Sequence, residues 1–114
     1  MNRFEVEFLP EVSKFLDELE FKAKEKIYFN IKKAQIINDS ELFKKLNENI
    51  WEFRTLYNGK AYRLFSFWDV NEKSLVVATH GLIKKTQKTP KNEIEKAEKI
   101  RKEYLEYKKK QNGK

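Results

Sequence analysis

The sequence contains no cysteine and only one histidine, His80. The lack of cysteine excludes a disulfide framework and a thiolate metal site. With a single histidine, a metal ion would have to be held mainly by carboxylates. We therefore expect no metal and no other cofactor.

Long apolar runs are also missing, since no stretch approaches the roughly 20 residues that a membrane span needs. Residues 1–10 alternate charged and apolar side chains, unlike a signal peptide. We expect a cytoplasmic protein with no membrane partner. The length of 114 residues suits one domain. We assign residues 1–114 to it and expect residues 108–114 to be a frayed tail.

Positive charge and aromatic side chains are abundant instead. The formal net charge is +7, and aromatic residues make up 14% of the chain. Aromatic side chains supply enough apolar area for a core. A basic balance favours a polyanionic partner such as nucleic acid or the ribosome, or an acidic protein. The alternative is a solvated lysine-rich surface.

Hydrophobic periodicity predicts an α+β fold in the order β-α-α-β-β-β-α. We expect a short turn capped by Asp39 or Ser40 after the second helix. The predicted fold is an antiparallel sheet, made of a three-strand meander plus the N-terminal strand, with an α-helical hairpin and a C-terminal helix. The expected strands are residues 3–8, 50–57, 61–69 and 74–83, and the expected helices are residues 10–19, 23–37 and 90–107.

The dipeptide Asn58-Gly59 predicts a two-residue hairpin turn, because both residues tolerate positive φ. That turn places Arg54 directly opposite Arg63. Like charges facing each other across two strands are destabilising, unless an anion lies between them. If a second turn is centred on residues 71–72, His80 also faces Arg63, whereas a three- or five-residue loop would turn His80 to the other face. The opposite face would hold core residues Trp51, Phe53, Tyr62, Leu64 and Trp68.

This row of residues has a chemical logic. Arginine forks match phosphate geometry, and histidine titrates near neutral pH and can move a proton. Lysines after the third strand of the meander could hold flanking phosphates. A structural interpretation remains open for each feature: Glu52 is close enough to pair with either arginine, a lone histidine is often structural, and a lysine-rich loop is often only solvated.

Three segments of the chain resemble a known family. They are IWEFR, YRLFSF and above all THGLIKKTQKTPKNEIEKAEKIRKEYL. Together they resemble the HigB-like branch of the RelE/ParE toxins, which includes phage-derived relatives, over residues 3–107. The resemblance implies a type II toxin that enters the ribosomal A site and cleaves messenger RNA. Cleavage there needs no metal, because the ribose 2′-hydroxyl attacks the adjacent phosphate.

The same resemblance implies residue roles and partners. Arg54 and Arg63 would stabilise transition-state charge, and His80 or Lys84 would transfer a proton. A HigA-like helix-turn-helix antitoxin would hold the toxin inactive, and the ribosome and messenger RNA would be the targets. The residues expected to contact RNA are Lys60, Lys85, Gln87 and Lys88.

One feature departs from the wider superfamily, in which several members place a proton-transfer Tyr or His near the C-terminus. Here Tyr104 and Tyr107 lie at helical spacing that suggests packing. Three other functions remain open. The chain could be a ParE-like inhibitor of DNA gyrase, a non-enzymatic module that binds RNA or protein, or an inactive phage remnant.

Overall fold

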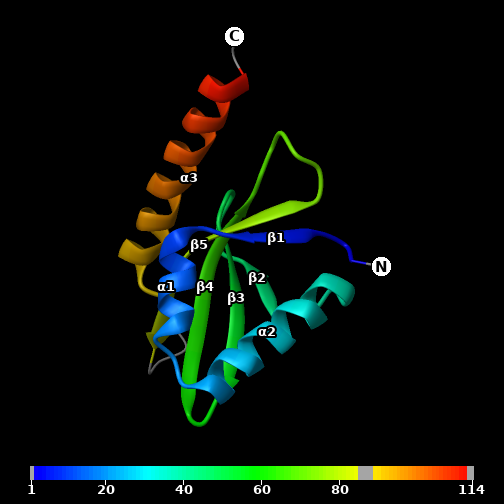
Figure 1. The fold of residues 1–114 in the computed structure, drawn as a ribbon, viewed down its shortest axis with the longest axis vertical. Helices are drawn as coiled ribbons and strands as arrows, with labels where there is room; N and C mark the ends of the chain where they lie inside the picture. The colour runs from blue at the N-terminus through cyan, green and yellow to red at the C-terminus, as the bar shows by residue number, and fades with distance from the viewer. Residues whose placement is uncertain (1, 85–88, 113–114) are drawn as a thin grey trace.

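Three helices pack on the two faces of a five-stranded sheet in the computed structural model, which describes residues 2–84 and 89–112 (Figure 1). The strands are β1 (Glu5–Phe8), β2 (Phe43–Lys45), β3 (Trp51–Tyr57), β4 (Lys60–Trp68) and β5 (Leu75–Lys84), and the helices are α1 (Pro10–Asp17), α2 (Phe21–Ile36) and α3 (Lys91–Asn112). The predicted α+β class is confirmed. No helix in the described ranges is long and apolar enough to cross a membrane.

The strand order is β1-β5-β4-β3-β2. Strands β3, β4 and β5 form the predicted antiparallel meander. Two features differ from prediction. The N-terminal strand pairs parallel to β5, so the sheet is mixed and not antiparallel. The segment expected as a capped turn contains β2, which follows a turn in which the Asp39 side chain accepts a hydrogen bond from the Glu41 N–H.

The predicted helical pair lies on one face of the sheet. Pro10 occupies the first turn of α1, where its missing N–H costs nothing. Figure 1 shows the two helices diverging, α1 over β5 and α2 over β3, rather than packing along each other. The five predicted core residues of the meander all belong to the cluster beneath these helices: Trp51, Phe53, Tyr62, Leu64 and Trp68.

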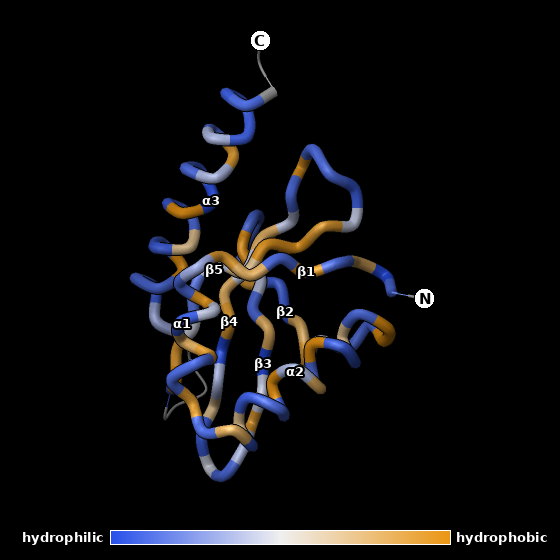
Figure 2. Tube along the Cα trace, viewed as in Figure 1, coloured by the Kyte–Doolittle hydropathy of each residue, from blue (hydrophilic) through white to orange (hydrophobic). Residues whose placement is uncertain are grey.

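The last helix, α3, covers part of the opposite face of the sheet. Ala97 is fully buried against a second cluster that contains Phe65, Phe67 and Val77. The Tyr104 hydroxyl donates a 2.9 Å hydrogen bond to Asp69, after the end of β4, so the predicted packing role of Tyr104 is confirmed. The same prediction is wrong for Tyr107, which is 62% exposed. Toward its C-terminal end α3 extends beyond the sheet, and Figure 2 shows that hydrophilic residues predominate along it.

Gly81 allows α1 to lie close to β5. A Cβ atom at this position would overlap the Cγ, Cδ2 and Cε2 atoms of the Phe15 ring. The ring therefore occupies space that any other residue would fill with its side chain. The glycine of the His-Gly dipeptide in β5 is explained by this packing.

We expect Gly81→Ala to destabilise the fold by about 1–3 kcal/mol, because the extra methyl group overpacks the contact with Phe15. Urea unfolding of both proteins measures the change. In a Phe15→Ala background the same substitution should cost much less, since the two positions are coupled. An equal cost in both backgrounds would show that Phe15 is not the cause.

Candidate active site

The β3–β4 hairpin sets the geometry of the site. Asn58 and Gly59 have φ angles of 51° and 78°, as the predicted turn requires. Arg54 consequently pairs with Arg63, as predicted. The Arg54 N–H donates a 2.8 Å hydrogen bond to Leu42 O, away from β4. The two arginines are therefore a pair without mutual backbone hydrogen bonds, the arrangement that brings opposing side chains closest together.

A buried carboxylate lies between these arginines. Glu52 Oε2 is 3.5 Å from Arg54 Nε, and Glu52 Oε1 is 3.6 Å from Arg63 Nε. The Thr89 hydroxyl, just before α3, donates to Glu52 at 3.1 Å and accepts from Lys84 Nζ at 3.2 Å. We call Glu52, Arg54, Arg63, Lys84 and Thr89 the cationic cluster. Residues from three strands and one loop thus meet around a single carboxylate.

Burial strengthens the electrostatics of this cluster. Glu52 and Arg63 are each 1% exposed and Lys84 is 6% exposed, whereas the Arg54 side chain is 21% exposed. Three cations and one carboxylate leave a formal charge of +2. Like charges at low dielectric repel strongly. An anion beside Arg54, the most exposed cation, would relieve that repulsion.

Burial, together with the surplus positive charge, lowers the pKa of two members of the cluster. Burial, and then the positive charge of Arg63, lower the pKa of Lys84 below its usual 10.5, with Arg54 adding to the effect. Burial also lowers the pKa of Arg63, with Glu52 opposing and Arg54 reinforcing the change. Arginine remains charged at neutral pH despite such shifts. Lys84 is therefore the member of the cluster most suited to exchange a proton.

The predicted alignment of His80 with Arg63 is wrong. The connection between β4 and β5 is longer than a two-residue turn, and Thr79 is an extra residue opposite the Phe65/Ser66 step. His80 therefore pairs with Phe65, and Leu82 lies opposite Arg63. The longer connection and the extra residue each shift the pairing by an odd number of residues. Together they shift it by an even number, so His80 still points to the same face as Arg63.

His80 links β5 to the first turn of α3. Its ring is 1% exposed and stacks on Phe65 with 4.8 Å between centroids. Nε2 lies 2.9 Å from Glu93 Oε1, and Nδ1 lies 2.9 Å from Thr79 Oγ1. Because a carboxylate only accepts, Nε2 carries the proton of the neutral ring. The single hydrogen of the Thr79 hydroxyl then lies between two acceptors, His80 Nδ1 and Phe65 O at 3.2 Å. This environment suits a structural histidine, and its catalytic role stays a prediction.

The charge state of His80 leads to a pH prediction. Burial lowers the pKa of His80 and the nearby Lys96 adds to this, whereas the hydrogen bond that His80 donates to Glu93 and the charges of Glu93 and Glu11 raise it. The unfolded chain, with a histidine pKa of about 6.5, then binds the proton more readily than the folded chain. Stability should fall as pH drops below about 6.5 and level off below the folded pKa. Urea midpoints at several pH values measure this.

His80→Gln supplies the control for that titration. The variant should lose about 1–3 kcal/mol from the missing hydrogen bond and stacking, and its stability should vary less between pH 8 and 5.5. An unchanged pH dependence in the variant would assign the effect to other groups.

Of the four residues predicted to contact RNA, one lies within the described part of the chain. Lys60 is exposed at the start of β4, beside the hairpin turn. Lys85, Gln87 and Lys88 lie outside the described residues. Thr89 was not anticipated at all, because a lone threonine after a basic loop gives no signal. Glu52 was recognisable only as a pairing partner, from its position two residues before Arg54.

Positive charge, a mixed sheet and the cationic cluster together define a small basic α+β domain with a site suited to a phosphate. The chain belongs to the Gp49-like family: the family model described as "Phage derived protein Gp49-like (DUF891)" matches residues 14–102, well over half of the chain. This is a phage-derived, toxin-like family of the RelE type, and such a toxin implies an antitoxin partner. No curated protein matches the chain.

Proposed function

We propose that this protein is a type II toxin that cleaves messenger RNA on the ribosome without a metal ion, as HigB-like toxins do. The observation that carries the proposal is the pairing of Arg54 with Arg63 around buried Glu52, beside Lys84. Family membership supports the toxin class, and the net charge of +7 supports a polyanionic target.

The cluster can stabilise the transition state of such a reaction and protonate its leaving group. The ribose 2′-oxygen forms a bond to phosphorus while the bond to the 5′-oxygen breaks, which leaves a cyclic phosphate and a free 5′-hydroxyl. Arg54 and Arg63 stabilise the charge that grows on the phosphate oxygens. The 2′-hydroxyl proton passes to solvent, and the Lys84 ammonium donates a proton to the departing 5′-oxygen. Glu52 holds the two guanidinium groups in place.

Translating ribosomes test the proposal directly. Purified protein should cut messenger RNA within codons, and mapping of the new ends should find 5′-hydroxyl groups that a kinase labels without prior phosphatase treatment. Intact messenger RNA together with stalled gyrase supercoiling would favour a ParE-like inhibitor instead. RNA binding without cleavage, and without an effect on gyrase, would favour the non-enzymatic module.

A neutralising partner is part of the same proposal. The toxin expressed alone should arrest growth, and co-expression with a HigA-like helix-turn-helix antitoxin should restore it. Growth that continues while folded toxin accumulates without any partner would contradict the proposed activity in that host.

A further inference from the structure

An open groove of about 530 Å³ begins at the cationic cluster and runs between α2 and β3. Arg54 and Arg63 of the cluster line this space together with Lys26 and Lys33 of α2. We call it the α2 groove. The groove connects the proposed site to α2. From the sequence alone, the lysines of this helix would be assigned only to its solvent-exposed face.

The short length of β2 produces the groove. This strand pairs with β3 only from Trp51 to Phe53. Beyond Phe53, Leu42 accepts the hydrogen bond from the Arg54 N–H, and the chain then turns away through Asp39. In the described part of the chain no strand lies beside Leu56 on this edge, and Leu56 is 63% exposed.

Helix α2 is held across this edge by a polar contact. Asn30 Nδ2 donates a 3.1 Å hydrogen bond to Thr55 Oγ1. Asn30 lies between Lys26 and Lys33 on the helix, so the contact keeps the part of α2 that carries both lysines beside β3. The two lysines are seven residues apart, which is two turns and about 10 Å along the helix axis. They therefore present two separate positive charges along the groove.

An exposed aromatic ring accompanies these lysines. Phe29 is 59% exposed and lies on the α2 surface next to Lys33. The Lys26 ammonium is 5.2 Å from the centroid of the Phe29 ring. Exposed aromatic rings flanked by cations are typical of surfaces that hold single-stranded nucleic acid, where bases stack and phosphates meet positive charge.

The charges of the groove fit the same ligand. Two lysines and two arginines line it, against the carboxylates of Asp39 and Glu41, which leaves a formal charge of +2. The Asp39 carboxylate is partly engaged, since Oδ1 accepts the Glu41 N–H at 2.8 Å. A polyanionic strand gains more from the cations than it loses to these acids.

We propose that the α2 groove holds the single-stranded RNA on one side of the phosphate bound at the cationic cluster. Lys26 and Lys33 contact backbone phosphates, and Phe29 stacks on a base. This inference rests on the proposed function. Arg54 lines the groove and also belongs to the proposed cleavage site, so a strand in the groove would be the RNA that is cut.

Fluorescence anisotropy tests the groove with a fluorescein-labelled ten-nucleotide single-stranded RNA whose 2′-hydroxyls are all methylated, so that 2′-hydroxyl attack cannot cleave it. Each lost phosphate contact should weaken binding roughly five-fold at 0.1 M salt and reduce the salt slope by about 0.7. Lys26→Gln/Lys33→Gln should therefore bind roughly 25-fold more weakly, with a slope smaller by about 1.4. Phe29→Ala should weaken binding by about ten-fold with little change in slope.

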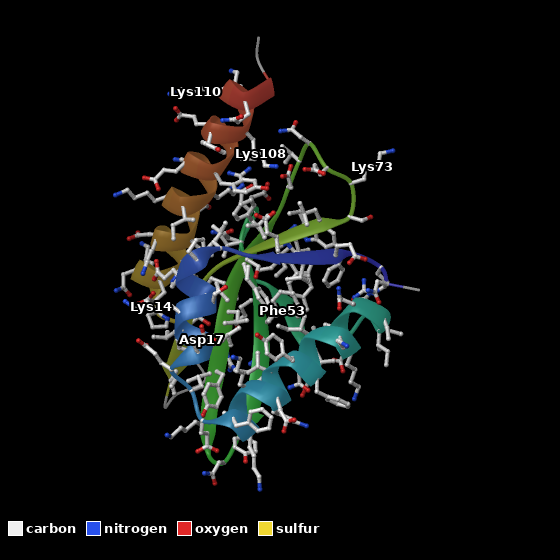
Figure 3. The ribbon with its side chains drawn as sticks, in the orientation of Figure 1. Lys14, Asp17, Phe53, Lys73, Lys108 and Lys110 are labelled. Atoms are coloured by element: carbon white, nitrogen blue, oxygen red, sulfur yellow. The ribbon has the colours of Figure 1, made fainter. Side chains whose placement is uncertain are left out.

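Lys73→Gln/Lys110→Gln is the matched control. It also removes two exposed lysines, which Figure 3 shows on the β4–β5 loop and near the end of α3, away from α2. The control should bind the RNA within about two-fold of wild type if specific contacts dominate over net charge. If the α2 variant and the control lose affinity equally, the groove is not the RNA site.

Cleavage on ribosomes separates this inference from the proposed function. If both hold, the α2 double variant should raise KM with little change in kcat, because it removes binding and leaves the cationic cluster intact. If the wild type cleaves and the α2 variant has an unchanged KM, the groove assignment alone is wrong. If the wild type does not cleave, the proposed function fails. If the α2 variant loses antitoxin binding and keeps RNA binding, the groove holds a protein instead.

Discussion

Replacing Arg63 with alanine is expected to lower the rate of messenger-RNA cleavage by at least about a hundred-fold, because one donor to the developing phosphate charge disappears. Arg63 is 1% exposed and lies 3.6 Å from Glu52. Its loss therefore also removes a buried ion pair, which costs about 3–5 kcal/mol when one partner is left behind. Activity must accordingly be compared at a temperature where the variant is folded.

Arg54→Gln separates catalysis from folding in the same experiment. The Arg54 side chain is 21% exposed, so its removal should disturb the fold less. We still expect a drop in kcat of about a hundred-fold, with partial recovery in Arg54→Lys, which restores charge but not the guanidinium fork. Lys73→Gln, on the exposed β4–β5 loop, controls for net charge. Full activity in folded Arg54→Gln would contradict the assignment of this cluster.

Removing the ammonium group of Lys84 should have an effect of similar or larger size. Loss of a general acid costs about 10²–10⁴-fold in rate, so Lys84→Met should be nearly inactive. Lys84→Arg distinguishes charge from proton transfer, because arginine keeps the charge but does not release a proton in this pH range. We expect Lys84→Arg to bind RNA normally and to cleave it slowly.

The pH profile gives an independent measurement of this role. Burial, with Arg63 and Arg54 nearby, lowers the pKa of Lys84 below 10.5. A general acid acts in its protonated form, so wild-type kcat should fall as pH rises through that lowered pKa. The alkaline decline should be absent from the residual activity of Lys84→Arg. An identical decline in both proteins would assign it to another group.

Local sequence was sufficient for much of this fold. The turn at Asn58-Gly59 joins strands that are neighbours in the chain, so its backbone preference alone sets the pairing of Arg54 with Arg63. Alternation along β3 and β4 likewise assigned Phe53 and Leu64 to the core beneath α1 and α2. These features depend on contacts within about twenty residues.

Contacts between distant segments decided the rest. The pairing of β1 with β5 joins segments about seventy residues apart, and no local pattern states its direction. The register of β5 depends on the extra residue Thr79, whose hydroxyl oxygen lies 3.2 Å from Phe65 O and 2.9 Å from His80 Nδ1. A β-bulge of this kind is maintained by surrounding packing.

The predicted alignment of Arg54, Arg63 and His80 across three strands is therefore correct only for the two arginines. Sequence alone placed Arg54 opposite Arg63, because a two-residue turn is a local property of the chain. Three arrangements are set only by the tertiary structure: the contact of His80 with Glu93 of α3, the contact of Thr89 with Glu52, and the α2 groove beside Arg54. Each of those arrangements depends on how a helix or loop packs against a strand far from it in sequence. The burial that lowers the pKa of Lys84 follows from the same packing.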